Sequence, residues 1–257
     1  SFICTLSSVF LIYLFGVLLY GSIGSFNKAS INMVKNGSMI YSNNPNKSIS
    51  EKITDEIKND SNVSDIIPLR GMNNSMNYQA VFGNAGGIQT FVLYSEDVNK
   101  ALKDFNLSLI NGRIPENNAH EITLPAEFVK QFNLKLGQYI NNSTNSGIHV
   151  DRDYKLVGIT EGDTFIPITC DVGTIKKADA QKSGFIFFFK NPDNKKLNDK
   201  IAKLKSKNVI IMDYKTMKEQ MDQMTSSMNF LYGALSIIIL LVLCISLGDR
   251  NYIICIN

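Results

Sequence analysis

Few residues in this chain are of the types that carry out catalysis or bind metals, and their spacing does not assemble a site. His120 and His149 have no second ligand at the spacing of a zinc site, and no CxxC pair is present. Glu116, Glu121 and Glu127 are spread over a predicted turn, strand and helix, which favours solvated charges over a catalytic pair. We therefore predict no catalytic residue, no metal ligand and no cofactor.

Sequence motifs of the common enzyme classes are also missing. The chain has no GxSxG or HExxH motif, which disfavours a membrane-anchored hydrolase. The glycine-rich segment 83–87 lacks the GxxxxGK[ST] spacing of a phosphate-binding loop, so we interpret it as a hairpin turn. A formal net charge of +3, with acidic residues mixed among the lysines, argues against a nucleic-acid partner. We expect a protein that is not an enzyme.

Charged residues are missing from long segments at the two ends of the chain. No charged residue occurs in 1–27 or in 223–248. Three of the four cysteines lie in or beside these ends, which leaves Cys170 without a partner for an internal disulfide in the centre. This division predicts a soluble central domain between two apolar segments.

Each apolar end is long enough to cross a membrane as a helix, because a hydrocarbon core of about 30 Å needs about 20 apolar residues. We predict transmembrane helices within 1–27 and 230–248, with 249–257 beginning a cytoplasmic segment. A cleaved signal peptide and a buried core helix are the alternatives for the first segment. Its uniform apolarity and the lack of a basic residue before it favour a span.

A single helix is predicted to run from Tyr214 into the second span, because no proline or glycine occurs before Gly233. Four methionines recur along it at the spacing of a coiled-coil seam, namely Met217, Met221, Met224 and Met228. Two interpretations stay open. Either the seam packs on its own domain, or 214–229 forms a stalk that pairs with an extension of the first span at 28–36, around Phe26 and Met33.

The central part of the chain alternates short strands and helices. Ser48 and Glu51 have the spacing of a capping box, and isoleucines every four residues predict an amphipathic helix there. The apolar run 184–189 (GFIFFF) predicts a central strand that is covered on both faces. Further strands are predicted at 63–69, 78–82, 88–94, 121–124, 139–140, 154–159 and 209–212, and further helices at 96–105, 125–132 and 195–206.

Four short motifs in the centre resemble a known family. Gly112-Arg-Ile-Pro115, Glu121-Ile-Thr-Leu124, Leu134-Lys-Leu-Gly137 and Leu156-Val-Gly158-Ile159 follow the order of landmarks in the extracytoplasmic domain of FtsX/MacB-type ABC transporter permeases. The sequence departs from the pattern at Gln138, where an aspartate is common. The landmark residues to which the resemblance assigns a structural role are Gly112, Arg113, Pro115, Glu121, Leu124, Gly137 and Gly158.

The resemblance implies an α+β fold with two lobes, flanked by two transmembrane helices. A membrane-proximal, ferredoxin-like α/β lobe is expected from 37–95 and 176–213, and a mixed α/β lobe from 96–175 is inserted between its halves. The family continues after the second span into further spans. The resemblance therefore implies that this chain is one part of a longer permease in the cell membrane, with its central domain extracytoplasmic.

The function implied by the resemblance is mechanical. A permease subunit of this kind couples ATP hydrolysis by a separate cytosolic ABC-type ATPase to movement of the outer domain, for export or for mechanotransmission. The membrane, that ATPase and a second permease half or a homodimer partner are the implied interaction partners. The alternative is the extracytoplasmic sensor domain of a two-span membrane receptor, because span, long domain and span is the same topology.

Overall fold

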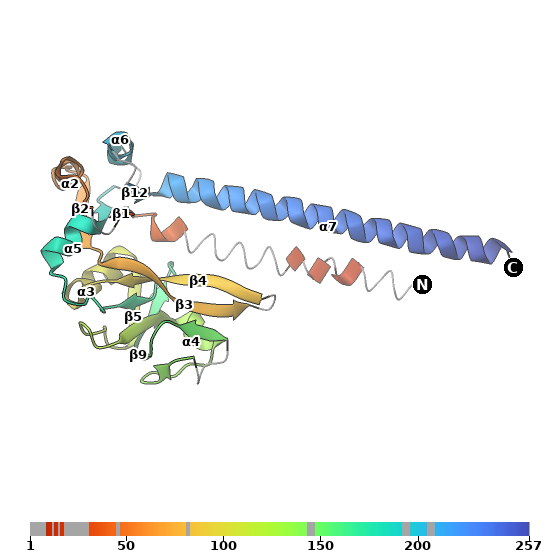
Figure 1. The fold of residues 1–257 in the computed structure, drawn as a ribbon, viewed down its shortest axis with the longest axis horizontal. Coiled ribbons are helices and arrows are strands. Elements are labelled where there is room, and N and C mark those ends of the chain that lie inside the picture. Colours follow the sequence, from red (N-terminus) through yellow and green to blue (C-terminus); the bar gives the residue numbers. More distant parts are fainter. Residues whose placement is uncertain are drawn as a thin grey trace. The chain divides into compact units, whose positions relative to one another are not determined.

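The chain divides into two units, one formed by its ends and one by its centre. We analysed a computed structural model, in which one unit comprises Ser1–Lys28 with Lys215–Asn257 and the other comprises Ala29–Tyr214 (Figure 1). The structure describes residues 9–11, 13–14, 16–17, 31–44, 47–80, 83–142, 147–191, 196–204 and 209–256. Most of the predicted first span therefore lies outside the described residues.

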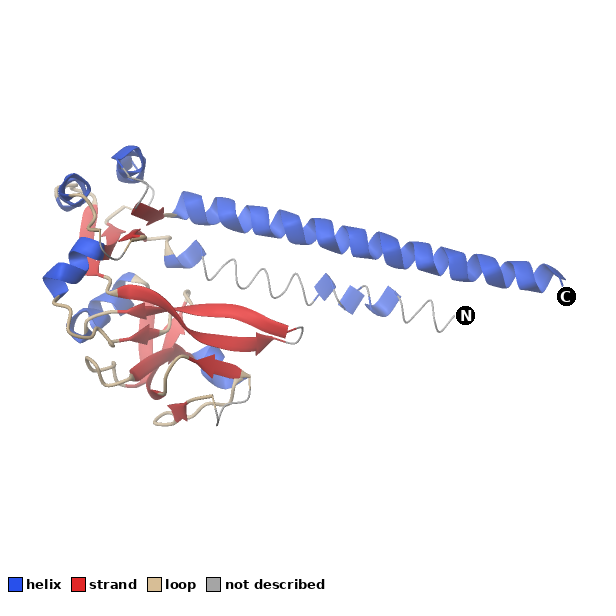
Figure 2. Ribbon diagram, in the orientation of Figure 1, coloured by secondary structure: helices blue, strands red, loops and turns tan. Residues whose placement is uncertain are grey.

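The first sheet of the central unit has four strands in the order β12-β1-β11-β2. Figure 2 distinguishes the strands of this unit from its helices by colour. β1 is antiparallel to both β11 and β12, and β11 is antiparallel to β2. Helix α2 connects β1 to β2, and α6 connects β11 to β12, which gives the β-α-β-β-α-β order of a ferredoxin-like fold. The predicted ferredoxin-like lobe is thus confirmed. Its elements are β1 (Gly37–Ser42), α2 (Glu51–Lys58), β2 (Val63–Pro68), β11 (Gly184–Phe189), α6 (Lys196–Leu204) and β12 (Val209–Met212).

The apolar strand β11 lies inside this sheet, as its sequence predicts, and all six of its residues are buried. On one face, Phe185 and Phe187 pack in a cluster with Ile53 and Ile57 of α2. The capping box predicted at Ser48 is wrong, because the helix begins at Glu51 and its N-cap is Ser50. The Ser50 hydroxyl accepts a hydrogen bond from the backbone N–H of Ile53 at 3.4 Å.

The second sheet of the central unit has eight strands. Seven follow the order β5-β9-β6-β10-β4-β3-β8, and β7 also pairs with β9. β6 runs parallel to β9 and β10 runs parallel to β4, while the other pairs are antiparallel. The strands are β3 (Gly71–Ala80), β4 (Gly83–Val92), β5 (Leu107–Gly112), β6 (Glu121–Pro125), β7 (Tyr139–Ile140), β8 (Ile148–Val150), β9 (Tyr154–Gly162) and β10 (Ile168–Thr169). Besides α2 and α6, this unit contains the helices α3 (Ser95–Asp104), α4 (Ala126–Gln131) and α5 (Lys177–Ser183).

The boundary between the two sheets lies earlier in the chain than the lobe boundary predicted at residue 95. Strands β3 and β4 belong to the eight-stranded sheet, so the chain passes from one sheet to the other between Pro68 and Gly71. The glycine-rich segment 83–87 is also not a turn, because it forms the start of β4 and Gly83 pairs with Ala80. The turn was predicted because glycine has a low strand propensity, and pairing with β3 overrides that propensity here.

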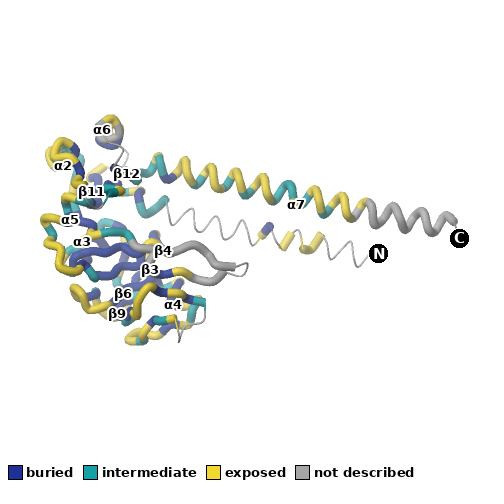
Figure 3. The backbone as a smooth tube through the Cα atoms, in the orientation of Figure 1, coloured by how far each residue is buried: buried dark blue, intermediate teal, exposed yellow. Residues whose placement is uncertain are grey.

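Phe105, at the C-terminal end of α3, joins the cores of the two sheets. Its ring centroid lies 5.7 Å from that of Phe91 in β4 and 5.0 Å from that of Phe188 in β11. A salt bridge of 2.5 Å between Lys100 of α3 and Asp65 of β2 lies at the same junction. Figure 3 shows buried backbone through the strands of both sheets. The central unit thus has two sheets that are connected by packed aromatic rings.

The charge of one half-buried carboxylate next to this junction is not balanced by hydrogen bonds to the buried oxygen. Asp104 Oδ2 is buried without a hydrogen-bond partner among the described residues. Burial, and then the charge of Asp65, raise the pKa of Asp104, although Lys100 and Lys103 act against them. Because the folded state holds this proton more tightly than the unfolded chain, folding stability falls as the pH rises through the raised pKa.

Replacement of Asp104 by asparagine should therefore increase the free energy of unfolding at pH 7, because the neutral amide does not carry the cost of a half-buried charge. The gain should shrink as the pH falls through the raised pKa and disappear below about 4, where the parent carboxyl becomes protonated in the unfolded state as well. Chemical denaturation of the full chain in detergent over this pH range measures it, with Asp199→Asn on exposed α6 as the control. A pH-independent difference would contradict the assignment.

Candidate functional site

The landmark residues gather around β9, where three segments of the chain meet. The backbone N–H of Arg113 donates to the carbonyl of Val157 at 2.9 Å, and that of Gly137 donates to the carbonyl of Leu156 at 2.7 Å. The end of β5 and the turn before β7 are thereby fixed on adjacent residues of one strand. Residues that lie far apart in the sequence form a single cluster.

Two glycines of this cluster leave no room for a side chain. A Cβ atom on Gly112 would lie 2.1 Å from the carbonyl oxygen of Val157, and Gly112 also has a φ of +81°. A Cβ atom on Gly158 would lie 2.4 Å from the carbonyl oxygen of Arg113. Glycine is therefore required at both positions for the strands to approach this closely.

An ion pair between Arg113 and Glu121 closes the cluster. Glu121, at the start of β6, has a side chain that is only 8% exposed and accepts hydrogen bonds from both terminal nitrogens of Arg113. It also accepts a hydrogen bond from the backbone N–H of Glu116 at 3.0 Å. Burial raises the pKa of Glu121, but the hydrogen bonds from Arg113 and Glu116 and the charge of Arg113 outweigh it, so the pKa lies below its ordinary value.

The remaining landmarks have structural contacts as well. The carbonyl oxygen of Pro115 accepts a hydrogen bond from the Ser95 hydroxyl at 2.8 Å, which attaches the loop to α3. Leu124 is fully buried in the core under β6 and β9. The landmarks thus lie in the eight-stranded sheet or in the loops attached to it.

The sequence analysis missed a second set of contacts to the loop between β5 and β6. Asn118 exchanges two hydrogen bonds with the backbone of Gly173, at 2.7 and 3.1 Å. His120 contacts Asp171 twice, through its backbone N–H at 3.1 Å and through Nδ1 at 2.9 Å. Both Asn118 and His120 have positive φ angles, +60° and +51°. An asparagine in this conformation is a known turn signal, but nothing local indicates its partner 55 residues away.

This cluster can stiffen a domain, but its groups do not form a nucleophile and base. Among the described residues, no group of three or more His, Cys, Asp or Glu side chains could hold a metal ion. Glu116 is 71% exposed, and Glu127 is also exposed, on α4. Cys170 is fully buried, and its pKa is raised to about 12, chiefly by burial and then by Asp171, Glu96 and Glu121, which leaves a neutral thiol.

The C-terminal helix α7 (Tyr214–Ile256) is continuous over 43 residues, as predicted, and passes through the predicted limit at 249 (Figure 1). Its part Tyr214–Val242 is long and apolar enough to cross a membrane, with a mean hydropathy of 1.7 in its most apolar window. Large apolar side chains stand exposed along it, from Phe230 at 76% to Val242 at 61%. Exposed apolar surface of this extent is stable in lipid and unfavourable in water.

One side of α7 is partly covered, and it differs from the predicted seam. Met217 is 5% exposed, and Met221, Thr225 and Met228 are half-buried, whereas Met224 is 39% exposed. The covered line thus passes through Thr225, because a straight helix of 3.6 residues per turn drifts away from a strict spacing of four and three. The predicted pairing of this helix with 28–36 stays a prediction. Met33 is half-buried, and Phe26 lies outside the described residues.

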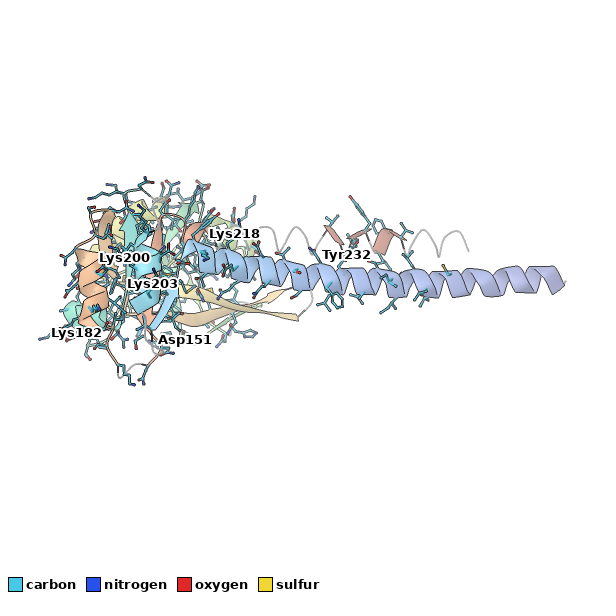
Figure 4. The ribbon with its side chains drawn as sticks, turned by 90° about the horizontal axis from the view of Figure 1, so that it is seen from above. Asp151, Lys182, Lys200, Lys203, Lys218 and Tyr232 are labelled. Atoms are coloured by element: carbon cyan, nitrogen blue, oxygen red, sulfur yellow. The ribbon has the colours of Figure 1, made fainter. Side chains whose placement is uncertain are left out.

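The two chain ends approach each other closely at one described point in their unit. Gly16 is buried, and a Cβ atom added to it would lie 2.7 Å from the hydroxyl oxygen of Tyr232 on α7 (Figure 4). Small residues permit such close contact between apolar helices in membranes. The contact is consistent with two apolar segments that pack side by side.

The geometry thus defines a class of protein, an α+β domain continuous with a helix suited to a membrane. No family model and no curated protein matches the chain. Among solved structures, it is similar to the periplasmic region of MacB from Actinobacillus actinomycetemcomitans, at 12% identity and a TM-score of 0.41, covering 75% of this chain and 95% of that one.

Two further structures are similar at the same low level. One is the extracellular domain of the noncanonical ABC-type transporter YknZ from Gram-positive bacteria, at 11% identity and a TM-score of 0.38, covering 69% of this chain and 100% of that one. The other is a domain of a permease protein from Porphyromonas gingivalis, at 11% identity and a TM-score of 0.35, covering 70% and 90%. Likeness of this degree does not assign a function.

The ion pair predicts a pH-dependent loss of stability. Glu121→Gln should lower the free energy of unfolding at pH 7 by about 1–3 kcal/mol, the range for a hydrogen-bonded charged group. The lowered pKa of the folded state means that the parent loses this stabilisation only as the pH falls below about 4, where the two proteins should converge. Denaturant unfolding of both proteins at several pH values measures the difference. The exposed Glu127→Gln serves as the control, and an equal effect of both variants would refute the role of Glu121.

The buried thiol predicts chemical inertness. In a variant with serine at the other three cysteine positions, Cys170 should not react with a maleimide at pH 8 while the chain is folded, and should react fully in denaturant. Mass spectrometry of the labelled chain measures both states. Rapid labelling of the folded protein would show that this part of the sheet opens or that the thiol is accessible.

Proposed function

We propose that this chain belongs to a membrane permease subunit of an ABC transporter. In this proposal, a separate cytosolic ATPase drives movement of the central, extracytoplasmic domain, for export or for mechanotransmission. The sequence landmarks support the proposal, since Gly112, Gly158 and the pair of Arg113 with Glu121 make contacts around one strand, β9. The long apolar helix α7 supports the location in a membrane.

The main support for a mechanical function is the short connection between α7 and the four-stranded sheet. β12 ends at Met212 and α7 begins at Tyr214, so a single residue, Asp213, lies between them. β12 is paired with β1 over four residues, from Met39 opposite Met212 to Ser42 opposite Val209. A displacement of the helix along its axis therefore acts on a hydrogen-bonded strand rather than on a flexible linker.

The same register places the start of β1, which follows the N-terminal segment, beside the end of β12, which leads into α7. β1 begins at Gly37, and Met39 pairs with Met212 at the end of β12. The Tyr41 hydroxyl reaches the sulfur of Met212 at 3.7 Å and adds a side-chain contact between the strands. The four-stranded sheet is accordingly the lobe that we assign next to the membrane, and the eight-stranded sheet is the outer, inserted lobe.

The proposal includes partners of defined kinds. Coupling to ATP hydrolysis requires the cytosolic ATPase, and a closed transport path requires a second permease half or a second copy of the chain. The membrane segments at the two ends would make the protein multi-pass together with the rest of the permease. The residues that we assign to coupling are the methionines of α7 and Met33 and Phe26, near the start of the central unit.

The mechanical proposal can be tested with two insertions of equal length in α7, one flexible and one stiff. Insertion of Gly-Gly after Met224 should reduce the ratio of transport to ATP hydrolysis several-fold, because each glycine costs about 1 kcal/mol of helix stability relative to alanine. Insertion of Ala-Ala at the same point shifts the register equally and keeps the helix stiff, so it isolates flexibility.

The measurement is transport and ATP hydrolysis in membrane vesicles that contain the subunit and its ATPase, with co-purification as proof that the ATPase stays bound. Equal coupling in the two insertion variants would contradict transmission through a stiff helix.

A further inference from the structure

The extramembrane part of α7 uses methionine for its large aliphatic positions. Between Tyr214 and Phe230 the aliphatic side chains larger than threonine are Met217, Met221, Met224 and Met228, four of the nine methionines in the chain. Apolar faces of other helices use branched residues instead, such as Ile53 and Ile57 in α2. Methionine specifies packing poorly because it is flexible, so packing alone does not account for this choice.

The four methionines lie on a narrow side of the helix. At 3.6 residues per turn, their positions fall within an arc of about 60°. Side chains three and four residues apart have Cβ atoms about 5–6 Å from each other. Met221 and Met228 are about 10 Å apart along the helix axis, with Met224 between them. Flexible thioether side chains can therefore converge on one point beside Met224.

Exposure separates Met224 from a packing role. Met217 is 5% exposed, whereas Met224 is 39% exposed and lies off the covered line, where Thr225 takes the half-buried position. Met221 and Met228 are half-buried on either side of it. Met224 is thus a large apolar side chain at an accessible position, with a sulfur-bearing neighbour one turn before it and one turn after it.

Thioether sulfur is a soft, uncharged ligand that selects Cu⁺ over hard divalent cations. We propose that Met221, Met224 and Met228 form a three-sulfur site for a soft monovalent cation, Cu⁺ or Ag⁺. The histidines and cysteines of the chain lack the spacing of a zinc site, which is why no metal ligand is predicted from them. This site uses another ligand class, and it does not depend on the proposed transport function.

The site can be tested with Ag⁺, a soft probe that needs no reducing agent. The full chain in detergent carries serine at positions 4, 244 and 255, so that these thiols do not compete, while Cys170 stays buried. Calorimetry in chloride-free buffer measures the stoichiometry, and the NMR signals of ¹³C-labelled methionine methyl groups report which sulfurs bind. We expect one Ag⁺ per chain and shifts of the three methyl signals at one equivalent.

Leucine variants distinguish a ligand role from a packing role, because leucine keeps the apolar volume and the helix propensity. The triple variant Met221→Leu, Met224→Leu, Met228→Leu should lose Ag⁺ binding by at least tenfold in affinity while its circular dichroism stays unchanged. The control Met217→Leu, on the same side but buried, should bind as the parent does. Retained binding in the triple variant, or methyl shifts confined to other methionines, would overturn the proposal.

Discussion

The pairing of β12 with β1 is the constraint on which the rest of the structure depends. β12 is a four-residue edge strand, and it is the only element between α6 and the 43-residue helix α7. β1 lies inside the sheet between β12 and β11, so the pairing connects α7 to an interior strand and, through it, to the fully buried strand β11. Without these hydrogen bonds, α7 would be attached to the domain through a flexible segment.

The second sheet is attached to the first by a different set of contacts. Phe105 packs between Phe91 and Phe188, so a ring of α3 contacts both sheets. Around β9, the close approach at Gly112 and Gly158 and the ion pair of Arg113 with Glu121 fix the loop between β5 and β6. Each contact joins segments that are distant in sequence. These contacts hold distant segments of the central unit together.

Local patterns predicted much of the fold but not the long-range contacts. The strand β11 follows from its apolar run and the helix α2 from apolar periodicity, and the part of α7 before Gly233 follows from the lack of proline and glycine. The segment 83–87 was misjudged because its pairing with β3, and not its own propensity, makes it a strand. In the candidate site, the glycine and Arg113 landmarks were predicted from resemblance, but the contact of His120 with Asp171 was not, since no local pattern relates them.

The central claim is that α7 is a stiff helix without a break from β12 to its apolar part. Hydrogen–deuterium exchange of the full chain in lipid nanodiscs, followed by mass spectrometry, tests it most directly. The account predicts slow exchange of the backbone amides from 218 to 229, at a level similar to those of β11, because every one of them donates within the helix. Fast exchange in this segment, with slow exchange on both sides of it, would contradict the account.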